Sequence, residues 1–215
     1  MTIKKNTEWG QEVAQCPPHQ CVGSDHEMGT HLNNRTANIF VLAGGSLFET
    51  LGRPSAPIVG GVAHCLPCDA ITVSIVAKGT QIELTAVNDV AIRNSWSHGG
   101  WLRGPVLVVT NTGMRRGRQI ASRAHPNDGH LDVVSVASMN MRQRVIGWSK
   151  AKLGSHVPHP KIVISRTTHV DLTVSPKQLL VIDGRRHNHV SRVTLTIAPD
   201  AAHVLIASGT NLYSR

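Results

Sequence analysis

Residues 111–134 read N-T-G-M-R-R-G-R-Q-I-A-S-R-A-H-P-N-D-G-H-L-D-V-V, and the fold is predicted outward from this stretch. Valine-rich apolar runs at 106–109 and 131–136 flank it, and β-branched residues of this kind favour strands. Between the runs, Pro-Asn-Asp-Gly at 126–129 predicts a tight turn, because Asn and Asp hydrogen-bond their own backbone and Gly accepts a positive φ. We therefore predict two strands joined by a basic loop that ends in a turn.

The composition favours a β-rich protein with a positive surface. The chain has 215 residues, of which 40% are hydrophobic and only 3% aromatic, so the core must consist mainly of aliphatic, often β-branched side chains. The net charge is +9, from 22 Lys and Arg against 13 Asp and Glu. That balance favours an anionic partner such as a phosphorylated ligand, an anionic lipid surface or nucleic acid.

Targeting signals are not evident in the sequence. No apolar run approaches the length of a membrane span, and no charged segment followed by an apolar one marks a secretory leader. We expect a cytoplasmic protein that is able to associate with a membrane surface.

The first third of the chain divides into two expected parts. Residues 1–36 have little apolar periodicity and are expected to be an irregular or disordered lead-in. Residues 37–68 begin with an apolar run, followed by a Gly-Gly-Ser turn and a short helix. The backbone N–H groups of Gly44, Gly45 and Ser46 could hold a phosphate at that helix start, although the same pattern also forms plain structural turns.

Residues 69–215 are expected to form a two-layer β-sandwich, because short β-branched runs separated by turns are typical of that architecture. A Gly- and Trp-rich loop is expected at 95–105, and a helix with apolar residues roughly on one face at 139–153. The expected strands are 70–76, 82–92, 106–110, 131–136, 162–164, 170–174, 179–182, 193–197 and 203–207.

The four cysteines allow a metal site or a redox pair. Four residues separate Cys16 from Cys21. Two residues separate Cys65 from Cys68, a spacing that lets both sulfur atoms reach one zinc ion or form one disulfide. A histidine near each pair is a reserve ligand. The linker between the pairs is far longer than in most compact zinc modules, so four ordinary reduced thiols are the interpretation that the spacing favours.

Several motifs together resemble the C-terminal domain of the bacterial diacylglycerol kinase-like lipid kinases. The resemblance covers about 43–206 and is strongest over 106–131. The motifs are Asn111-Thr-Gly113, Ile120-Ala121, Ala124, Pro126-Asn-Asp-Gly-x-Leu131-Asp132, Gly154-Ser-His156, Val181-Ile-Asp183-Gly184 and, upstream, Gly44-Gly-Ser46 with Leu51-Gly-x-Pro54.

The resemblance implies an N-terminal α/β domain that holds ATP, a C-terminal β-sandwich as in diacylglycerol and NAD kinase-like proteins, and an active site between them. The family's nucleotide loop, Gly-Gly-Asp-Gly-Thr, does not occur in this chain, and 37–68 are only a remnant of that domain. The family's Asp-Gly-Glu motif, whose glutamate is the proposed general base, is Asp183-Gly184-Arg185 here. A guanidinium cannot accept a proton at neutral pH, so no catalytic residue carries over.

The resemblance also implies a structural cation, Mg²⁺ or Ca²⁺, in the Asp-Gly loop. Its ligands would be Asp128 and the backbone carbonyls of His125 and His130, and hard cations prefer such oxygen ligands. The same turn can also hold itself together without metal, through hydrogen bonds from the Asn and Asp side chains.

An anionic headgroup would find its partners among the arginines. Arg115, Arg116, Arg118 and Arg185 are the candidates, because a guanidinium makes paired hydrogen bonds to phosphate oxygens.

Three functions are consistent with these features. The first is a truncated or degenerate lipid kinase-like protein that binds a phospholipid and is not catalytically competent alone. The second is an active ATP-dependent lipid kinase that phosphorylates a diacylglycerol-type hydroxyl; ATP is a cofactor only in this case, and a homodimer or a partner chain would supply the nucleotide domain. The third is a basic module for a membrane surface or nucleic acid in which Arg123 joins the cluster, nucleic acid being the partner favoured least.

Overall fold

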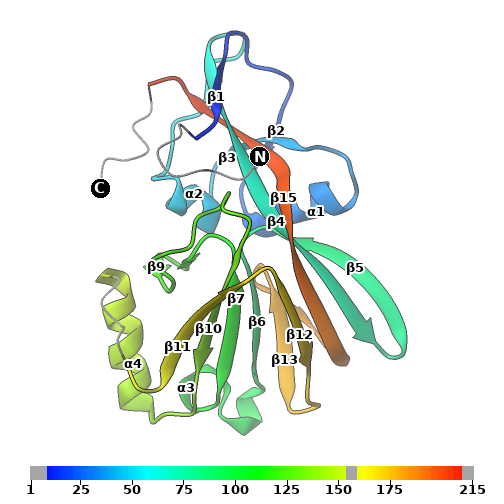
Figure 1. Ribbon diagram of the computed structural model, residues 1–215, viewed down its shortest axis with the longest axis vertical. Helices are drawn as coiled ribbons and strands as arrows, with labels where there is room; N and C mark the ends of the chain where they lie inside the picture. The colour runs from blue at the N-terminus through cyan, green and yellow to red at the C-terminus, as the bar shows by residue number, and fades with distance from the viewer. Residues whose placement is uncertain (1–8, 154–158, 210–215) are drawn as a thin grey trace.

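The computed structural model describes residues 9–153 and 159–209, and strands dominate it (Figure 1). One sheet, sheet A, contains β1 (Gln11–Val13), β2 (Gln20–Val22), β3 (Ile39–Leu42), β4 (Ala63–Ala77), β5 (Thr80–Ala86), β12 (His169–Thr173) and β15 (Val190–Ala207). A second sheet, sheet B, has the order β11-β10-β7-β6-β13-β14 and contains β6 (Asp89–Asn94), β7 (Val106–Thr110), β10 (Leu131–Val136), β11 (Ile162–Thr167), β13 (Gln178–Ile182) and β14 (Arg185–His187).

The helices are short and lie outside the sheets. They are α1 (Asp25–Asn33), α2 (Ser46–Thr50), α3 (Gly100–Arg103) and α4 (Met141–Lys150), with 3-10 turns η1 (Trp96–His98) and η2 (Ala151–Leu153); β8 (Met114–Arg115) and β9 (Arg118–Gln119) form a small separate ribbon. Among the described residues, no helix has the length and apolar character needed to cross a bilayer.

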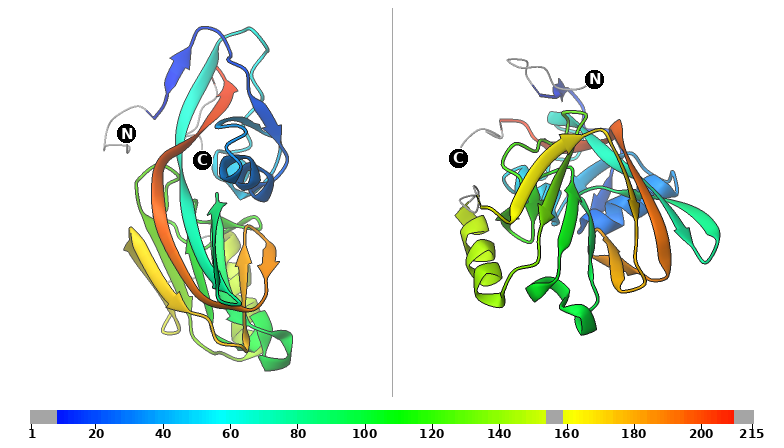
Figure 2. Two further views of the ribbon diagram at one scale, coloured as in Figure 1. Left: turned by 90° about the vertical axis from the view of Figure 1, so that its right-hand side faces the viewer. Right: turned by 60° about the horizontal axis from the view of Figure 1, so that its bottom comes forward.

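Two long strands, β4 and β15, run antiparallel through the whole molecule (Figure 2). Their lower halves, 70–77 and 190–198, pair with β5 and β12 and face sheet B. The space between the two layers is filled by aliphatic side chains: Ile71, Val73, Ile75, Ala86, Val90, Ile92, Val109, Leu131, Val174, Leu180, Ile182, Val190, Val193 and Leu195. This arrangement confirms the predicted two-layer β-sandwich.

The upper halves of β4 and β15, 63–68 and 202–207, belong to a second core. There β15 pairs in parallel with β3, and β3 in parallel with β2, so that β2, α1 and β3 form one βαβ unit. We expected an irregular lead-in up to residue 36, but β1, β2 and α1 are regular elements. The reason is tertiary packing that local periodicity cannot reveal: Trp9, Val22 and Met28 are buried against Phe40, Leu66 and Val204. Residues 1–8 lie outside the described part of the chain.

Four predicted elements differ in their boundaries. The strand expected at 82–92 is two strands, because the polar turn at Val87-Asn88 separates β5 from β6. The strands expected at 193–197 and 203–207 are one strand, β15, interrupted by a bulge between Ala198 and Ala202. The helix expected at 139–153 is α4 followed by η2, and the side chain of Asn140 caps its start by accepting a hydrogen bond from Gln143 N.

The Pro-Asn-Asp-Gly turn lies beside the bulge of β15 and is held there by Asp69. The buried Asp69 carboxylate accepts hydrogen bonds from the backbone N–H of Gly129 at 2.8 Å and of Asp200 at 3.0 Å. The backbone N–H of Asp69 in turn donates to Pro126 O at 2.7 Å. One carboxylate therefore joins β4, the bulge and the turn.

A second carboxyl group, that of the partly buried Asp183 in the turn between β13 and β14, links sheet B to the upper core. It accepts three backbone hydrogen bonds, from Val87 N at 2.7 Å, Asp89 N at 2.9 Å and Asn88 N at 3.0 Å. Gly29 of α1 packs so closely here that a Cβ would lie 2.6 Å from Thr85 O and 3.7 Å from Asp183 Oδ2. Burial, with a further contribution from the nearby Asp25 carboxylate, raises the pKa of Asp183 to about 7.

This raised pKa predicts a specific dependence of stability on pH. Because the folded state holds the Asp183 proton up to about pH 7 while the unfolded chain releases it near pH 4, the free energy of unfolding should fall as the pH rises between these values, by at most about 1.4 kcal/mol per pH unit. Asp183→Asn should have a shallower slope than the wild type in urea titrations from pH 4 to pH 8.

The matched control is Asp171→Asn. Asp171 is exposed and paired with Arg192, which lowers its pKa to about 2, so its charge does not change between pH 4 and pH 8. Parallel curves for the wild type and Asp183→Asn would show that Asp183 is ionised throughout and would contradict the prediction.

Candidate functional site

Two strand-to-helix turns meet at the carboxyl ends of the parallel strands β2 and β3. The predicted phosphate-side turn, Gly44, Gly45 and Ser46, is one of them, and it leads into α2. The other is Gly23-Ser24-Asp25 at the start of α1, which the sequence analysis did not single out. The turns touch through their backbones, because a Cβ at Gly44 would lie 2.6 Å from Gly23 O.

The start of α2 is occupied by a side chain of the protein itself. The Asp25 carboxylate accepts hydrogen bonds from Ser46 N at 2.7 Å and Leu47 N at 3.0 Å. Gly45 has a φ of +100°, and a Cβ there would lie 2.5 Å from Asp25 Oδ1, so only glycine fits beside this carboxylate. The N–H groups that would receive a phosphate therefore already have an anionic partner.

The start of α1 is closed in a similar way. Ser24 Oγ accepts a hydrogen bond from Glu27 N at 3.2 Å, and Gly23 N donates to Glu27 Oε2 at 2.8 Å. This is a variant of the capping box in which the glutamate reaches the N–H of Gly23, the residue before the N-cap, and the pattern Ser-x-x-Glu was visible in the sequence. The segment Gly23-Ser24-Asp25-His26-Glu27 agrees with Gly-Gly-Asp-Gly-Thr only at its first and third positions.

The candidate headgroup arginines are not in one place. Arg185 is exposed on β14 and lies close enough to α1 that, after burial, it is the second cause of the lowered pKa of His26. Arg118 donates from Nε to Trp148 O at 3.0 Å and stacks on the Trp148 ring at 4.7 Å, so it holds α4 in place. Arg115 and Arg116 line a groove on the outer face of sheet B.

Arg115 is buried at the base of this groove. Its guanidinium forms an ion pair with Asp89 and stacks on Trp101 at 4.7 Å. Burial, followed by repulsion from Arg116, lowers the pKa of Arg115 to about 10. Arg93, also buried, lies between Trp96 at 5.7 Å and Trp101 at 5.6 Å, and burial together with Arg186 and Arg116 lowers its pKa. Positive charges are thus concentrated here beyond what Asp89 neutralises.

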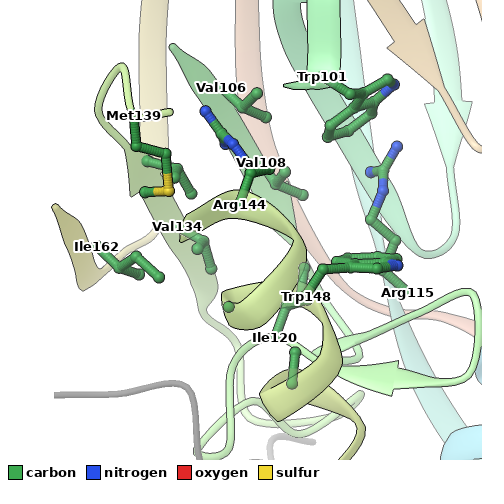
Figure 3. Close-up of a pocket in the computed structure, with 13 residues that line it drawn as sticks. Trp101, Val106, Val108, Arg115, Ile120, Val134, Met139, Arg144, Trp148 and Ile162 are labelled. Atoms are coloured by element: carbon green, nitrogen blue, oxygen red, sulfur yellow. The ribbon is translucent and has the colours of Figure 1, made fainter. Parts of the chain in front are cut away.

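The groove consists of two adjoining hollows of about 90 Å³ and 320 Å³ between α4 and sheet B. Both are bordered by Trp101, Arg115, Arg144 and Trp148 (Figure 3). The deeper hollow has an apolar floor made by Val106, Val108, Ile120, Val134, Val136, Met139 and Ile162, and the outer one opens between Trp96, Leu102, Arg116 and Val145. None of the described lining residues carries a carboxylate.

Arg144, on α4, places a positive charge at the groove that no carboxylate among the described lining residues neutralises. Its Nη2 donates to Gly104 O at 2.6 Å, whereas its buried Nε has no hydrogen-bond partner among the described residues. Burial lowers the pKa of Arg144. A buried guanidinium without a carboxylate beside it is costly, and an anion in the groove would lower the electrostatic part of that cost.

Asp128, the carboxylate of the predicted cation-binding loop, is already paired with a positively charged side chain of the protein. Asp128 Oδ2 accepts a hydrogen bond from Arg166 Nη2 at 2.7 Å, and Asp128 Oδ1 accepts one from His130 N at 3.0 Å. His125 Nδ1 accepts from Asn127 N at 3.2 Å. Within the described residues, no three or more His, Cys, Asp or Glu side chains are arranged to hold a metal ion. A cation bound by Asp128 and backbone carbonyls stays a prediction, and it would have to share Asp128 with Arg166.

The cysteines do not form a redox pair. Cys65 and Cys68 are three residues apart on β4, so their side chains point to opposite faces of sheet A and join different apolar clusters. All four cysteines are free thiols, and burial raises the pKa of Cys65 and of Cys68. Cys16 Sγ lies 3.6 Å from His19 Nδ1, and Cys21 is exposed on β2.

Comparison with known proteins identifies the family. Among solved structures, yeast NADH kinase complexed with NADH superposes with a TM-score of 0.54 at 12% identity, over 91% of this chain and 62% of the kinase, so the chain spans less than two thirds of that enzyme. A diacylglycerol kinase from Bacillus anthracis str. Sterne superposes with a TM-score of 0.47 at 12% identity, over 87% of this chain and 82% of that one. No curated protein matches the sequence.

The family assignment itself comes from the sequence match. At 12% identity, the superposition on yeast NADH kinase shows a shared fold and nothing further. The family described as the YegS C-terminal NAD kinase beta sandwich-like domain matches residues 59–206, which is more than half of the chain. This match confirms the resemblance noted in the sequence, and the chain belongs to the YegS C-terminal NAD kinase beta sandwich-like domain family.

Proposed function

We propose that this protein is a diacylglycerol kinase-like protein that binds an anionic amphiphile, such as a phospholipid, and does not itself transfer phosphate. The observation that carries the proposal is the groove under α4, in which the guanidinium groups of Arg115, Arg116 and Arg144 border an apolar floor. A ligand that complements it has an anionic headgroup beside the arginines and an alkyl chain on the valine and isoleucine side chains.

The electrostatics of the groove favour an anion. Arg115 is neutralised in part by Asp89, but Arg116 is exposed, and the buried Arg144 Nε has no partner among the described residues. A phosphate would accept charge-assisted hydrogen bonds from such groups and relieve the mutual repulsion with Arg93. The hollow of about 320 Å³ is at the lower end of the range for small-ligand pockets.

Three features near α1 and α2, at the upper end of sheet B, speak against phosphoryl transfer. Transfer needs a held nucleotide, a metal ion on its phosphates and a polarised acceptor hydroxyl. The helix N-terminus that would face a phosphate is occupied by Asp25. The Asp183 carboxyl group accepts hydrogen bonds from three backbone N–H groups. By the resemblance to the family, Arg185 occupies the position of the glutamate that is the proposed general base. Losing a general base alone typically lowers a rate by about 10²–10⁴.

The first test concerns catalysis. The purified chain, given radiolabelled ATP, Mg²⁺ and vesicles containing diacylglycerol, should form no phosphatidate above the level without protein. Arg185→Glu should not restore activity, because Asp25 still occupies the start of α2. An active diacylglycerol kinase acting on the same vesicles is the positive control. ATP-dependent formation of phosphatidate by the unmodified chain would overturn the non-catalytic part of the proposal.

The second test concerns binding, with a short-chain phosphatidate that stays monomeric in solution. Arg116→Glu should weaken binding about tenfold or more, since it replaces a charge-assisted contact by repulsion. Arg35→Glu is its matched control, because Arg35 is also an exposed arginine with a positive φ but follows α1, away from the groove. The measurement is titration calorimetry at fixed salt.

Gly147 allows the apolar part of the groove to be tested separately. It borders the deeper hollow, and a Cβ there would meet no atom within 4 Å, so a larger side chain enters open space. Gly147→Leu should fill the hollow and weaken binding, whereas Gly147→Ala should bind like the wild type while stabilising α4 by about 1 kcal/mol. Equal affinities for the wild type, Arg116→Glu and Gly147→Leu would exclude the groove as the ligand site.

A further inference from the structure

The outward surface formed by η1, α3 and α4 carries large apolar side chains that remain partly exposed, although Arg93 stacks on Trp96 and Arg118 on Trp148. None of the ten residues of α4 is buried. We call this surface the α4 face and define it by six side chains, each between 36% and 60% exposed: Trp96, Leu102, Met141, Val145, Ile146 and Trp148. Isolated exposed apolar residues are common in soluble proteins, but a group on one surface marks an interaction site.

The α4 face lies in the most basic part of the chain. No Asp or Glu occurs between residues 90 and 127, and none between 133 and 170. These two stretches supply η1, α3, α4, β7 and β11, and all of β6 and β10 except Asp89, Leu131 and Asp132. They contain twelve of the 22 basic residues: Arg93, Arg103, Arg115, Arg116, Arg118, Arg123, Arg142, Arg144, Lys150, Lys152, Lys161 and Arg166. All 13 acidic residues lie outside the two stretches, although Asp89, Asp128 and Asp132 border them and pair with Arg115 and Arg166, so positive charge still predominates in this part of the chain.

The groove opens on this same surface. Four of the six side chains of the α4 face, Trp96, Leu102, Val145 and Trp148, also form the mouth of the outer hollow. Tryptophan prefers the boundary between water and hydrocarbon, because its ring is apolar and its N–H needs a polar partner. Arg142, on α4 itself, and Arg103, at the end of α3, place positive charge beside these apolar side chains.

We propose that the α4 face is a peripheral membrane-docking surface that binds an anionic bilayer. The tryptophan and aliphatic side chains would enter the interfacial layer while the surrounding Arg and Lys contact anionic headgroups, which is how basic amphipathic surfaces bind membranes. One consequence of docking rests on the proposed function. With the α4 face on the membrane, the mouth of the groove faces the bilayer, so an amphiphile could enter the groove without crossing water. The docking itself requires only the charge and the exposed apolar side chains.

The test is flotation of the purified chain with vesicles. The wild type should float with phosphatidylcholine vesicles that contain phosphatidylglycerol and should stay behind with pure phosphatidylcholine. Binding should weaken at high salt, because surface charges are screened. With brominated acyl chains in the anionic vesicles, the fluorescence of the exposed Trp96 and Trp148 should be quenched.

The decisive variant is the double substitution Met141→Glu and Ile146→Glu. Both residues are exposed on α4 and neither borders the groove, so the fold and the soluble-ligand site should remain intact. Binding to anionic vesicles should fall about tenfold or more. The matched control, Ile58→Glu with Val59→Glu, adds the same two charges at exposed apolar residues in the loop between α2 and β4, and it should bind like the wild type.

The outcomes separate docking from ligand binding. Equal flotation of the wild type and the α4 double variant would overturn the docking proposal, as would a wild type that binds monomeric short-chain phosphatidate but not anionic vesicles. In the second case the proposed function would stand. Flotation that depends on Met141 and Ile146, without any affinity for monomeric phosphatidate, would support docking and reject the proposed ligand.

Discussion

The antiparallel ladder between β4 and β15 is the interaction on which the rest of the structure depends. It runs from Val190 opposite Ala77 to Ala207 opposite Ala63, so one pair of strands contributes to both apolar cores. Side chains alternate between faces along a strand, and a shift of one residue in this register would turn the buried side chains of both cores to the opposite face. The sandwich and the βαβ unit above it therefore cannot be specified independently, although the family match begins only at residue 59.

The bulge in β15 shows how a local sequence signal acquires its role from a distant partner. Asn127, Asp128 and Gly129 predicted a turn from their own chemistry, and a turn is present. What fixes its place is the Asp69 carboxylate, which binds Gly129 N and Asp200 N from segments 60 and 131 residues away. Asp200 has a positive φ, and the side chain of Asn127 donates to its carboxylate at 2.9 Å. No periodicity or propensity identifies such a pairing.

The sequence predicted the sandwich well because each β-branched run buries one face, whereas it missed the order of residues 9–36. That order depends on Trp9 and Met28, which are buried by side chains of β3, β4 and β15. The candidate site was predicted only in part. Arg115 and Arg116 lie in the groove, but Arg118 holds α4 and Arg185 faces α1. That Arg144 lines the groove could not be predicted from the helical pattern, since it depends on how α4 packs against sheet B.

The upper end of sheet B, near α1 and α2, and its outer face, under α4, differ in how their charges are satisfied, and this difference connects the fold to the proposed function. Toward α1 and α2, the carboxylates of Asp25, Glu27 and Asp183 accept hydrogen bonds from the backbone N–H groups of neighbouring turns. Such carboxylates stabilise the fold, and a nucleotide phosphate would have to displace them at a cost. Toward α4, the buried Arg144 Nε has no hydrogen-bond partner in the part of the chain that the structure describes, and Arg116 raises the electrostatic free energy of Arg93 and Arg115. These contacts would disfavour an anion near α1 and α2 and favour one under α4, which is the distribution that the proposed function requires.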